Sequence, residues 1–326
     1  MLKKYGFVIL ILMTIILSSC MEKQLPSIPE ELSFAATVNI KDMSVSFVDL
    51  KKMAIAEEWR MEKPYTGALI LPDQDTILFF GSQLEKADLY SLKEGKKIGS
   101  WETGIGIVNG LLLDSGKEAA LVDQNLNKIR FFNLQGQELK QIEAGSDPLT
   151  ILESEPLKKL FVLSFNSEKL AGIDLQSKEK SEEFAIHPSA AGAWLNDGSN
   201  EIWIGGHGEG IEIEKNIHVY DTETGALKKT IPAPSMPVNF LEKDDYVYVL
   251  SHGSNMLYKI NDLGEKAASV SVAANPFEMA LAEERLLVAG YDSNDIHILD
   301  PESLKSLKTI KVGKGPFKIV LRERMK

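Results

Sequence analysis

The chain has 326 residues, of which 44% are apolar and 25% charged, and its formal net charge is −11. This size and composition are those of an ordinary globular protein with one large domain or two small ones. Nucleic acid and anionic lipid headgroups bind basic surfaces, so the acidic excess argues against nucleic-acid binding and against electrostatic attachment to a membrane.

The N-terminal residues resemble a bacterial secretory leader. Two lysines precede an apolar run at residues 7–17, which is too short to span a bilayer. The sequence LSSC at residues 17–20 follows directly and resembles a lipobox, the motif in which the cysteine is diacylated and becomes the new N-terminus. We therefore expect residues 1–19 to be a lipoprotein signal peptide and Cys20 to carry the lipid.

The expected lipidation would place the chain on a membrane. Cys20 is the only cysteine, so the exported domain has no disulfide and depends on packing for its stability. Two acyl chains give stable attachment. Residues 20–32, with Pro26 and Pro29, predict a short, stiff tether. The sequence thus predicts a protein anchored by lipid to the extracytoplasmic side of a bacterial cell membrane.

The rest of the chain is a tandem repeat, seen most clearly at residues 217–256. There the strand-like run IHVYD is followed by a Thr-Gly turn, a second run, a proline-led run and the run YVYVL. Apolar residues alternate, as in Val247 and Val249, which favours strands over helices. The polar residue that closes the first run recurs about every forty residues, which is a period typical of propeller blades. These residues are Asp49, Ser91, Asn133, Asp174, Asp221, Asn261 and Asp300. The seven copies predict an all-β fold, a seven-bladed β-propeller.

The ends of the repeat predict how the ring closes. Residues 34–59 match the last three strands of a copy, and residues 316–321 match only the first strand. One blade should therefore combine three N-terminal strands with one C-terminal strand, a 3+1 join that leaves no open sheet edge. Residues 33–326 should form a single propeller, with complete blades at residues 66–101, 106–142, 148–184, 190–231, 236–272 and 276–311.

At these residues the chain resembles the YVTN class of seven-bladed propeller repeats. That class has a proline-led strand, a Ser-Asn turn and the motif V-x-V-I-D-T-x-T-G. The corresponding residues here are SN at 254–255, DTETG at 221–225, GID at 172–174 and NDIHILD at 294–300. The literal tetrapeptide is absent, with YVYV at 246–249 in its place. The resemblance implies a propeller in an extracytoplasmic setting and no single activity, because the functions of the class are diverse.

One residue of each innermost strand is predicted to face the central channel, because alternation along a strand turns the polar set toward water. This channel row is Ala68, Asn109, Thr150, Gly192, Asn239, Glu278 and Lys318. Glu278 and Lys318 come from adjacent blades and can pair. A solvated channel explains the row. The alternative is a divalent-metal site, because Asn109, Asn239 and Glu278 partly match the oxygen ligands of calcium-dependent lactonase propellers, although the charge of Lys318 opposes a bound cation.

A second row is predicted at one mouth of the channel, where the second strand of each copy ends. It comprises Ile40, Ser82, Gln124, Phe165, His207, His252 and Tyr291. His207 and His252 come from successive copies, and with Glu209 or Glu212 they could hold a metal or an anionic ligand. Two histidines are few for a metal site, so exposed or turn-stabilising histidines are the simpler interpretation. Glu209 and Glu212 lie in an insertion at residues 205–216, which is either a binding loop or a tolerated excursion.

The sequence favours binding over catalysis. It contains no Gly-x-Ser-x-Gly elbow, phosphate-binding loop or haem attachment motif, and no cofactor or metal-ligand set is assigned. We expect a non-enzymatic binding or scaffold module that takes a protein, peptide or glycan partner on its channel-mouth face, with candidate residues Gln124, His207, Glu209, Glu212, His252 and Tyr291. The alternative is an extracytoplasmic hydrolase or lactonase with a divalent metal in the channel.

Overall fold

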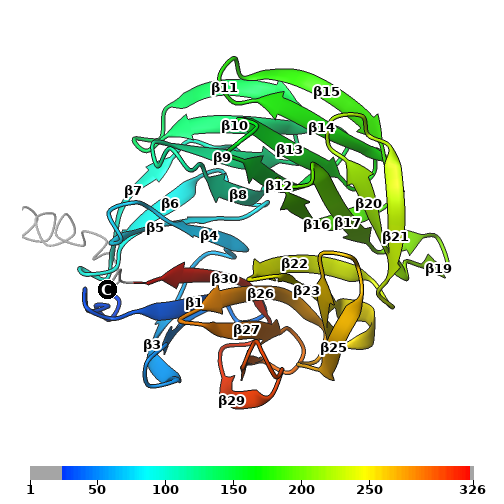
Figure 1. The fold of residues 1–326 in the computed structure, drawn as a ribbon. Coiled ribbons are helices and arrows are strands. Elements are labelled where there is room, and N and C mark those ends of the chain that lie inside the picture. Colours follow the sequence, from blue (N-terminus) through cyan, green and yellow to red (C-terminus); the bar gives the residue numbers. More distant parts are fainter. Residues whose placement is uncertain (1–23, 324–326) are drawn as a thin grey trace, which may run out of the picture.

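The computed structural model describes residues 24–323, which form a ring of seven four-stranded antiparallel sheets around a central channel (Figure 1). The seven-bladed propeller predicted from the repeat is therefore confirmed. The innermost strand of each blade contacts the innermost strands on either side, so the ring is closed. The expected signal peptide, Cys20 and the first residues of the expected tether lie outside the described residues. Within residues 24–323 there is no helix long and apolar enough to cross a membrane.

Blade 1 joins the two ends of the chain. It contains β1 (Phe34–Asn39), β2 (Ser44–Asp49), β3 (Ala54–Arg60) and, as its innermost strand, β30 (Pro316–Arg322). Strand β30 runs antiparallel to β1, with Val320 opposite Ala36. This is the 3+1 join that the ends of the repeat predict.

Blades 2 to 7 follow in chain order, each beginning with its innermost strand. Blade 2 consists of β4 (Gly67–Ile70), β5 (Thr76–Phe80), β6 (Ala87–Ser91) and β7 (Lys96–Trp101). Blade 3 consists of β8 (Ile107–Leu112), β9 (Glu118–Asp123), β10 (Lys128–Asn133) and β11 (Glu138–Glu143). Blade 4 consists of β12 (Pro148–Ser154), β13 (Lys159–Ser164), β14 (Lys169–Asp174) and β15 (Glu179–Ala185).

Blade 5 carries the insertion. Its sheet consists of β16 (Ala190–Asn196), β17 (Glu201–Gly206), β20 (Asn216–Asp221) and β21 (Leu227–Pro232), and the insertion forms a separate hairpin of β18 (Gly208–Glu209) and β19 (Glu212–Ile213). Blade 6 consists of β22 (Pro237–Lys243), β23 (Tyr246–Ser251), β24 (Met256–Asn261) and β25 (Lys266–Ser271), with the 3-10 turn η1 (His252–Ser254) after β23. Blade 7 consists of β26 (Pro276–Ala282), β27 (Arg285–Gly290), β28 (Asp295–Leu299) and β29 (Ser306–Lys311).

The recurring polar residue caps the turn between the third and fourth strands of a blade. Asp221 Oδ1 accepts a hydrogen bond from the backbone N–H of Thr224, at 2.8 Å. Gly225 follows with a φ of 70°, a left-handed conformation that costs glycine no steric strain. In blade 7, Asp300 accepts in the same way from the N–H of Ser303, at 2.7 Å. The period detected in the sequence is thus the period of a capped turn.

The apolar core lies between the blades. Seven clusters of buried apolar side chains are found in the described chain, one at each contact between neighbouring blades. Between blades 2 and 3, for example, Trp101 stacks on Phe132 with ring centroids 5.7 Å apart, and Phe80 and Leu121 pack beside them. A blade that buries its faces only against its neighbours is stable only within the ring.

Residues 24–32, predicted as part of the tether, pack against the propeller. The N–H of Leu25 donates to the carbonyl oxygen of Gly95, and the N–H of Ile28 to that of Leu92, both at 2.8 Å. The side chain of Ile28 is fully buried in the cluster between blades 1 and 2. These residues are therefore part of the folded domain.

Candidate functional site

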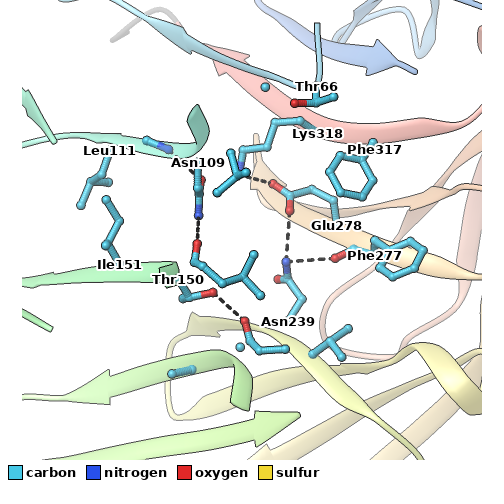
Figure 2. Close-up of a pocket in the computed structure, with 18 of the residues that line it drawn as sticks. Thr66, Asn109, Leu111, Thr150, Ile151, Asn239, Phe277, Glu278, Phe317 and Lys318 are labelled. Carbon is cyan, nitrogen blue, oxygen red and sulfur yellow. Dashed lines mark hydrogen bonds and ion pairs between the residues drawn. The ribbon is translucent and has the colours of Figure 1, made fainter. Parts of the chain in front are cut away.

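Figure 2 shows the lining of the central channel, a cavity of about 640 Å³. In blades 3 to 7 the pairing of the innermost strand with the second strand shifts register just before the channel-row residue. Six members of the predicted row line the cavity, namely Asn109, Thr150, Gly192, Asn239, Glu278 and Lys318.

The polar side chains of the row bind the blades to one another. Asn109 Nδ2 donates to the carbonyl oxygen of Leu149 at 3.0 Å, and Thr150 Oγ1 donates to that of Ala191 at 2.6 Å. In both cases the acceptor belongs to the next blade and precedes its own row residue. Asn239 continues the pattern, with Nδ2 3.2 Å from the carbonyl oxygen of blade 7 that precedes Glu278. These donors are thus used in contacts between blades.

The acidic residue in the channel, Glu278, forms an ion pair. Lys318 Nζ lies 2.7 Å from Glu278 Oε1, and Asn239 Nδ2 lies 3.2 Å from Glu278 Oε2 (Figure 2). Each carboxylate oxygen therefore has a donor from a neighbouring blade. A divalent ion at Glu278 would have to displace the ammonium group of Lys318.

Blade 2 departs from the predicted row by one residue. Ala68 is fully buried and pairs with Phe79, while Gly67 lines the channel and pairs with Phe80. The strand β4 has no register shift with β5, unlike the innermost strands of blades 3 to 7. The alignment that selected Ala68 is therefore wrong by one position in this blade.

Gly192→Ala is expected to destabilise the ring. A Cβ atom at Gly192 would lie 2.0 Å from the carbonyl oxygen of Val238, in the next blade. Because blades 5 and 6 would have to shift apart, the expected loss is about 1–3 kcal/mol of unfolding free energy, measurable by urea unfolding. Gly198→Ala is the control, since a Cβ there meets its nearest atom at 3.4 Å. Equal losses in the two variants would contradict this prediction.

Six aromatic rings from five blades form an arc at the channel mouth. We call this set the aromatic arc; it consists of Phe165, His207, His252, Phe277, Tyr291 and Phe317, all partly exposed. Successive ring centroids lie 5.6, 5.3, 4.6 and 5.7 Å apart from Phe165 through His207, His252 and Phe277 to Tyr291. Phe317 closes the arc beside Phe277, at 5.9 Å. Four of the six rings in the arc thus belong to the mouth row predicted from the sequence. The other two, Phe277 and Phe317, come from innermost strands.

Polar contacts hold the arc in place. His252 Nδ1 lies 2.7 Å from Asn275 Oδ1. Lys41 Nζ stands 4.0 Å from the centre of the Tyr291 ring and 2.7 Å from Asp292 Oδ1. Burial, together with the neighbouring ring of His252, lowers the pKa of His207, so the arc carries no charge at His207 near neutral pH.

The other predicted face residues are dispersed. Gln124 lines the channel cavity. Glu209 and Glu212 are exposed on the β18–β19 hairpin and line a separate depression with Pro188 and Ile211. The predicted metal-binding set of His207, His252 and Glu209 or Glu212 is not among the side-chain groups in residues 24–323 whose ligand atoms lie close enough to share a metal ion.

A cluster that sequence reasoning missed lies at the base of the hairpin. The ligand atoms of His187, Glu214 and His218 all lie within 4.8 Å of one another. Burial, and secondarily His218, lower the pKa of His187 to about 4. Burial alone would raise the pKa of Glu214, but hydrogen bonding to the N–H of Asn216 and the nearby His218 lower it. The sequence did contain a signal for this cluster, because three of the five histidines lie in the one irregular copy, between Asp174 and Asp221.

No family profile matches the sequence, and no curated protein matches it. Solved structures do match. A chain of Kuenenia stuttgartiensis hydrazine synthase is 15% identical with a TM-score of 0.73, covering 89% of this chain and 99% of that one. A functionally unknown protein from Desulfotomaculum acetoxidans is 14% identical with a TM-score of 0.71, covering 88% and 98%. Apo AztD from Citrobacter koseri is 15% identical with a TM-score of 0.59, covering 89% and 97%. At these identities the similarity establishes the fold alone.

Proposed function

We propose that this chain is a membrane-tethered, extracytoplasmic propeller that binds a partner through the aromatic arc and catalyses no reaction. The observation that carries the proposal is the arc itself, with six partly exposed rings in contact around one mouth of the channel. The basic and apolar leader followed by Cys20 supports the membrane location.

Exposed aromatic rings held by their neighbours make an effective binding surface. Aromatic side chains dominate the energetics of many interfaces because they bury a large area and pack with specific geometry. Here each ring is already restrained, as Phe277 is by the rings of His252 and Tyr291, so little side-chain entropy remains to be lost on binding. The adjoining cavity of about 640 Å³ can accept a side chain of the partner.

The partner we propose is a protein or peptide segment with aromatic or aliphatic side chains. A glycan would need several free hydrogen-bonding groups at the arc and in the adjoining channel. In the channel, the amide groups of Asn109 and Asn239 and the hydroxyl of Thr150 already donate to neighbouring blades. The arc therefore favours apolar side chains over sugar hydroxyls.

The channel geometry supports binding over hydrolysis. The Glu278 carboxylate contacts both Lys318 and Asn239, which occupy its two oxygens and compete with its use as a base or metal ligand. The sequence also allows a metal-dependent hydrolase as the alternative function. In such an enzyme Lys318 would first have to move away from Glu278 before a metal ion could bind there.

Site-specific photocrosslinking in intact cells tests the proposal. A benzophenone amino acid would replace Tyr291 in the full-length chain, and the matched control would carry it at Leu263, which is 68% exposed on the turn between β24 and β25. We expect a discrete adduct from position 291 and none from position 263, with identification by mass spectrometry. Adding Phe277→Ala should remove the adduct, because that ring lies 5.7 Å from Tyr291 and also contacts His252.

Three outcomes would contradict the proposal. Equal adducts from the two positions would mean that contact is nonspecific, and no adduct from either would remove the mouth as a binding surface. An adduct that resists protease and is released by glycosidase would identify a glycan in place of a peptide. Thermal unfolding of each variant excludes misfolding as the cause of a lost adduct.

A further inference from the structure

Three segments of blade 5 meet beneath the β18–β19 hairpin. His187 lies in the loop between β15 and β16, Glu214 follows β19, and His218 is the third residue of β20. The rings of His187 and His218 are stacked with centroids 4.0 Å apart, and Glu214 Oε2 lies 3.2 Å from His218 Nε2. The three residues belong neither to the aromatic arc nor to the channel row, and the N–H of Glu214 donates to the carbonyl oxygen of His207, a member of the arc, at 3.1 Å.

We propose that His187, Glu214 and His218 form a binding site for a divalent transition-metal ion, with Zn²⁺ as the best chemical match. Two imidazoles and one carboxylate supply the nitrogen and oxygen donors that zinc accepts. Three protein ligands leave the fourth position of a tetrahedral ion to water or to a group from a bound partner.

The same position in other blades shows why this cluster is unusual. In blades 1, 3 and 6 the third residue of the third strand makes a hydrogen bond with the loop that leads into its blade. The examples are Ser46 with the N–H of Gly313 at 3.0 Å, Tyr258 with the carbonyl of Pro234 at 2.6 Å, and Arg130 with the carbonyl of Thr103. In blade 5 the contact is a stack of two imidazoles, and Nε2 of His187 is buried without a hydrogen-bond partner among the described residues.

The remaining contacts orient the ligands. Glu214 Oε1 accepts from the N–H groups of Lys215 and Asn216, at 2.9 and 2.8 Å, so its Oε2 is directed to His218. His187 Nδ1 lies 3.3 Å from the hydroxyl of Tyr220, which leaves Nε2 as its unsatisfied nitrogen. Outer hydrogen bonds of this kind fix the ring and carboxylate orientations at metal sites.

Metal binding requires a small rearrangement. With metal–ligand bonds of about 2.0–2.1 Å, the ligand atoms of a tetrahedral ion lie roughly 3.3 Å apart, so the three groups must move closer together and the stacked rings must turn. Glu214 also lines the depression beside the hairpin, which gives the cluster a route to solvent. Glu209 and Glu212 line the same depression, and their charge attracts cations toward the site.

Zinc competition on the purified full-length chain in mild detergent tests the site. After removal of metals with a chelator, we expect one equivalent of Zn²⁺ to bind in competition with a chromogenic chelator. His218→Gln and Glu214→Gln should each weaken zinc binding by at least about 10–100-fold. That is the loss of metal affinity typical when only a hydrogen-bond partner of a ligand is removed, and these variants remove a ligand itself. Zn²⁺ should raise the melting temperature of the wild type and not of these variants. Co²⁺ should give visible absorption typical of a tetrahedral site.

Two histidine variants serve as matched controls. His297 occupies the equivalent third position of β28 in blade 7, and His252 belongs to the aromatic arc. His297→Gln and His252→Gln should therefore retain wild-type zinc affinity. The melting temperature and circular dichroism of each metal-free variant establish that it is folded.

The result that would overturn the inference is specific. Wild-type protein that binds neither Zn²⁺ nor Co²⁺ would remove the site. Stoichiometric binding that survives the double change His187→Gln and His218→Gln, or that is lost in His252→Gln, would place the metal elsewhere. Failure of the zinc test and failure of the photocrosslinking test are distinguishable, because position 291 is in blade 7 and the cluster is in blade 5.

Discussion

Deleting residues 316–326 should prevent the chain from forming a stable propeller. The deletion removes β30, the innermost strand of blade 1, and exposes the edge of β1. Ile319 and Val320 are 5% and 8% exposed and belong to the apolar clusters on the two sides of blade 1. Burying two aliphatic side chains contributes about 3–6 kcal/mol at about 1.5–3 kcal/mol each, against a typical domain stability of about 5–15 kcal/mol.

Arg322 adds to the cost of this deletion. Its guanidinium donates to the carbonyl oxygens of Leu32, at 3.0 and 3.1 Å, and of Gln74, at 3.2 Å, which links the C-terminal strand to the N-terminal segment and to blade 2. We expect loss of the cooperative thermal transition and aggregation on size-exclusion chromatography. Truncation after residue 323 leaves β30 intact and is the control. A cooperative transition close to that of the wild type would show that the join is dispensable.

Arg130→Met should strongly destabilise the propeller. Arg130 Nη1 lies 3.0 Å from Asp123 Oδ2, and Nη2 lies 2.7 Å from Glu138 Oε2. The side chain of Asp123 is 1% exposed, so the variant would leave its charge buried without a cation. Removing one partner of a buried ion pair costs about 3–5 kcal/mol. Urea unfolding at neutral pH measures the loss.

Lys128→Met is the matched control for this prediction. Lys128 lies on the same strand and pairs with Glu143, whose side chain is 73% exposed. A surface pair of this kind contributes about 0–1 kcal/mol, so the control should remain close to the wild type. A loss of similar size in the two variants would mean that burial of Asp123 does not determine the effect.

The effect of Arg130→Met should diminish in acid. Hydrogen bonding to Arg130 lowers the pKa of Glu138 in the folded protein, and burial opposes this shift. A carboxyl group whose folded pKa is below its unfolded value of about 4.3 stabilises the fold above that value, and the contribution is lost as the pH falls through the folded pKa. The variant lacks the cation that produces this shift. The difference in unfolding free energy between wild type and variant should therefore be largest near neutral pH and narrow as the pH falls below about 4.

The architecture could be predicted from the sequence because a blade is encoded locally. Six of the seven blades are continuous runs of four strands, and a capped turn recurs in the sequence, as at Asp221 and Asp300. The unmatched strands at the two ends likewise predicted the 3+1 join, since a sheet edge in a ring must find a partner. The predicted lipidation at Cys20 and the membrane location remain predictions.

The channel and mouth could be predicted only in part. Alternation along the innermost strands located Asn109, Glu278 and Lys318 in the channel. It placed Ala68 in the row because the missing register shift in blade 2 depends on how β4 pairs with β5. Phe277 belongs to neither predicted row, although its ring stacks on His252 in the arc.

The sequence by itself determined the repeat, the closure of the ring and the positions of the turns, because these depend on residues that are neighbours in the chain or on the period of the pattern. Only the tertiary structure decided which side chains meet between blades. His187 and His218 belong to different segments, and the packing of the loop between β15 and β16 against β20 brings their rings to 4.0 Å. Glu214 joins them because the insertion folds back as a hairpin. Such contacts carry no period, so pattern analysis alone could not find them.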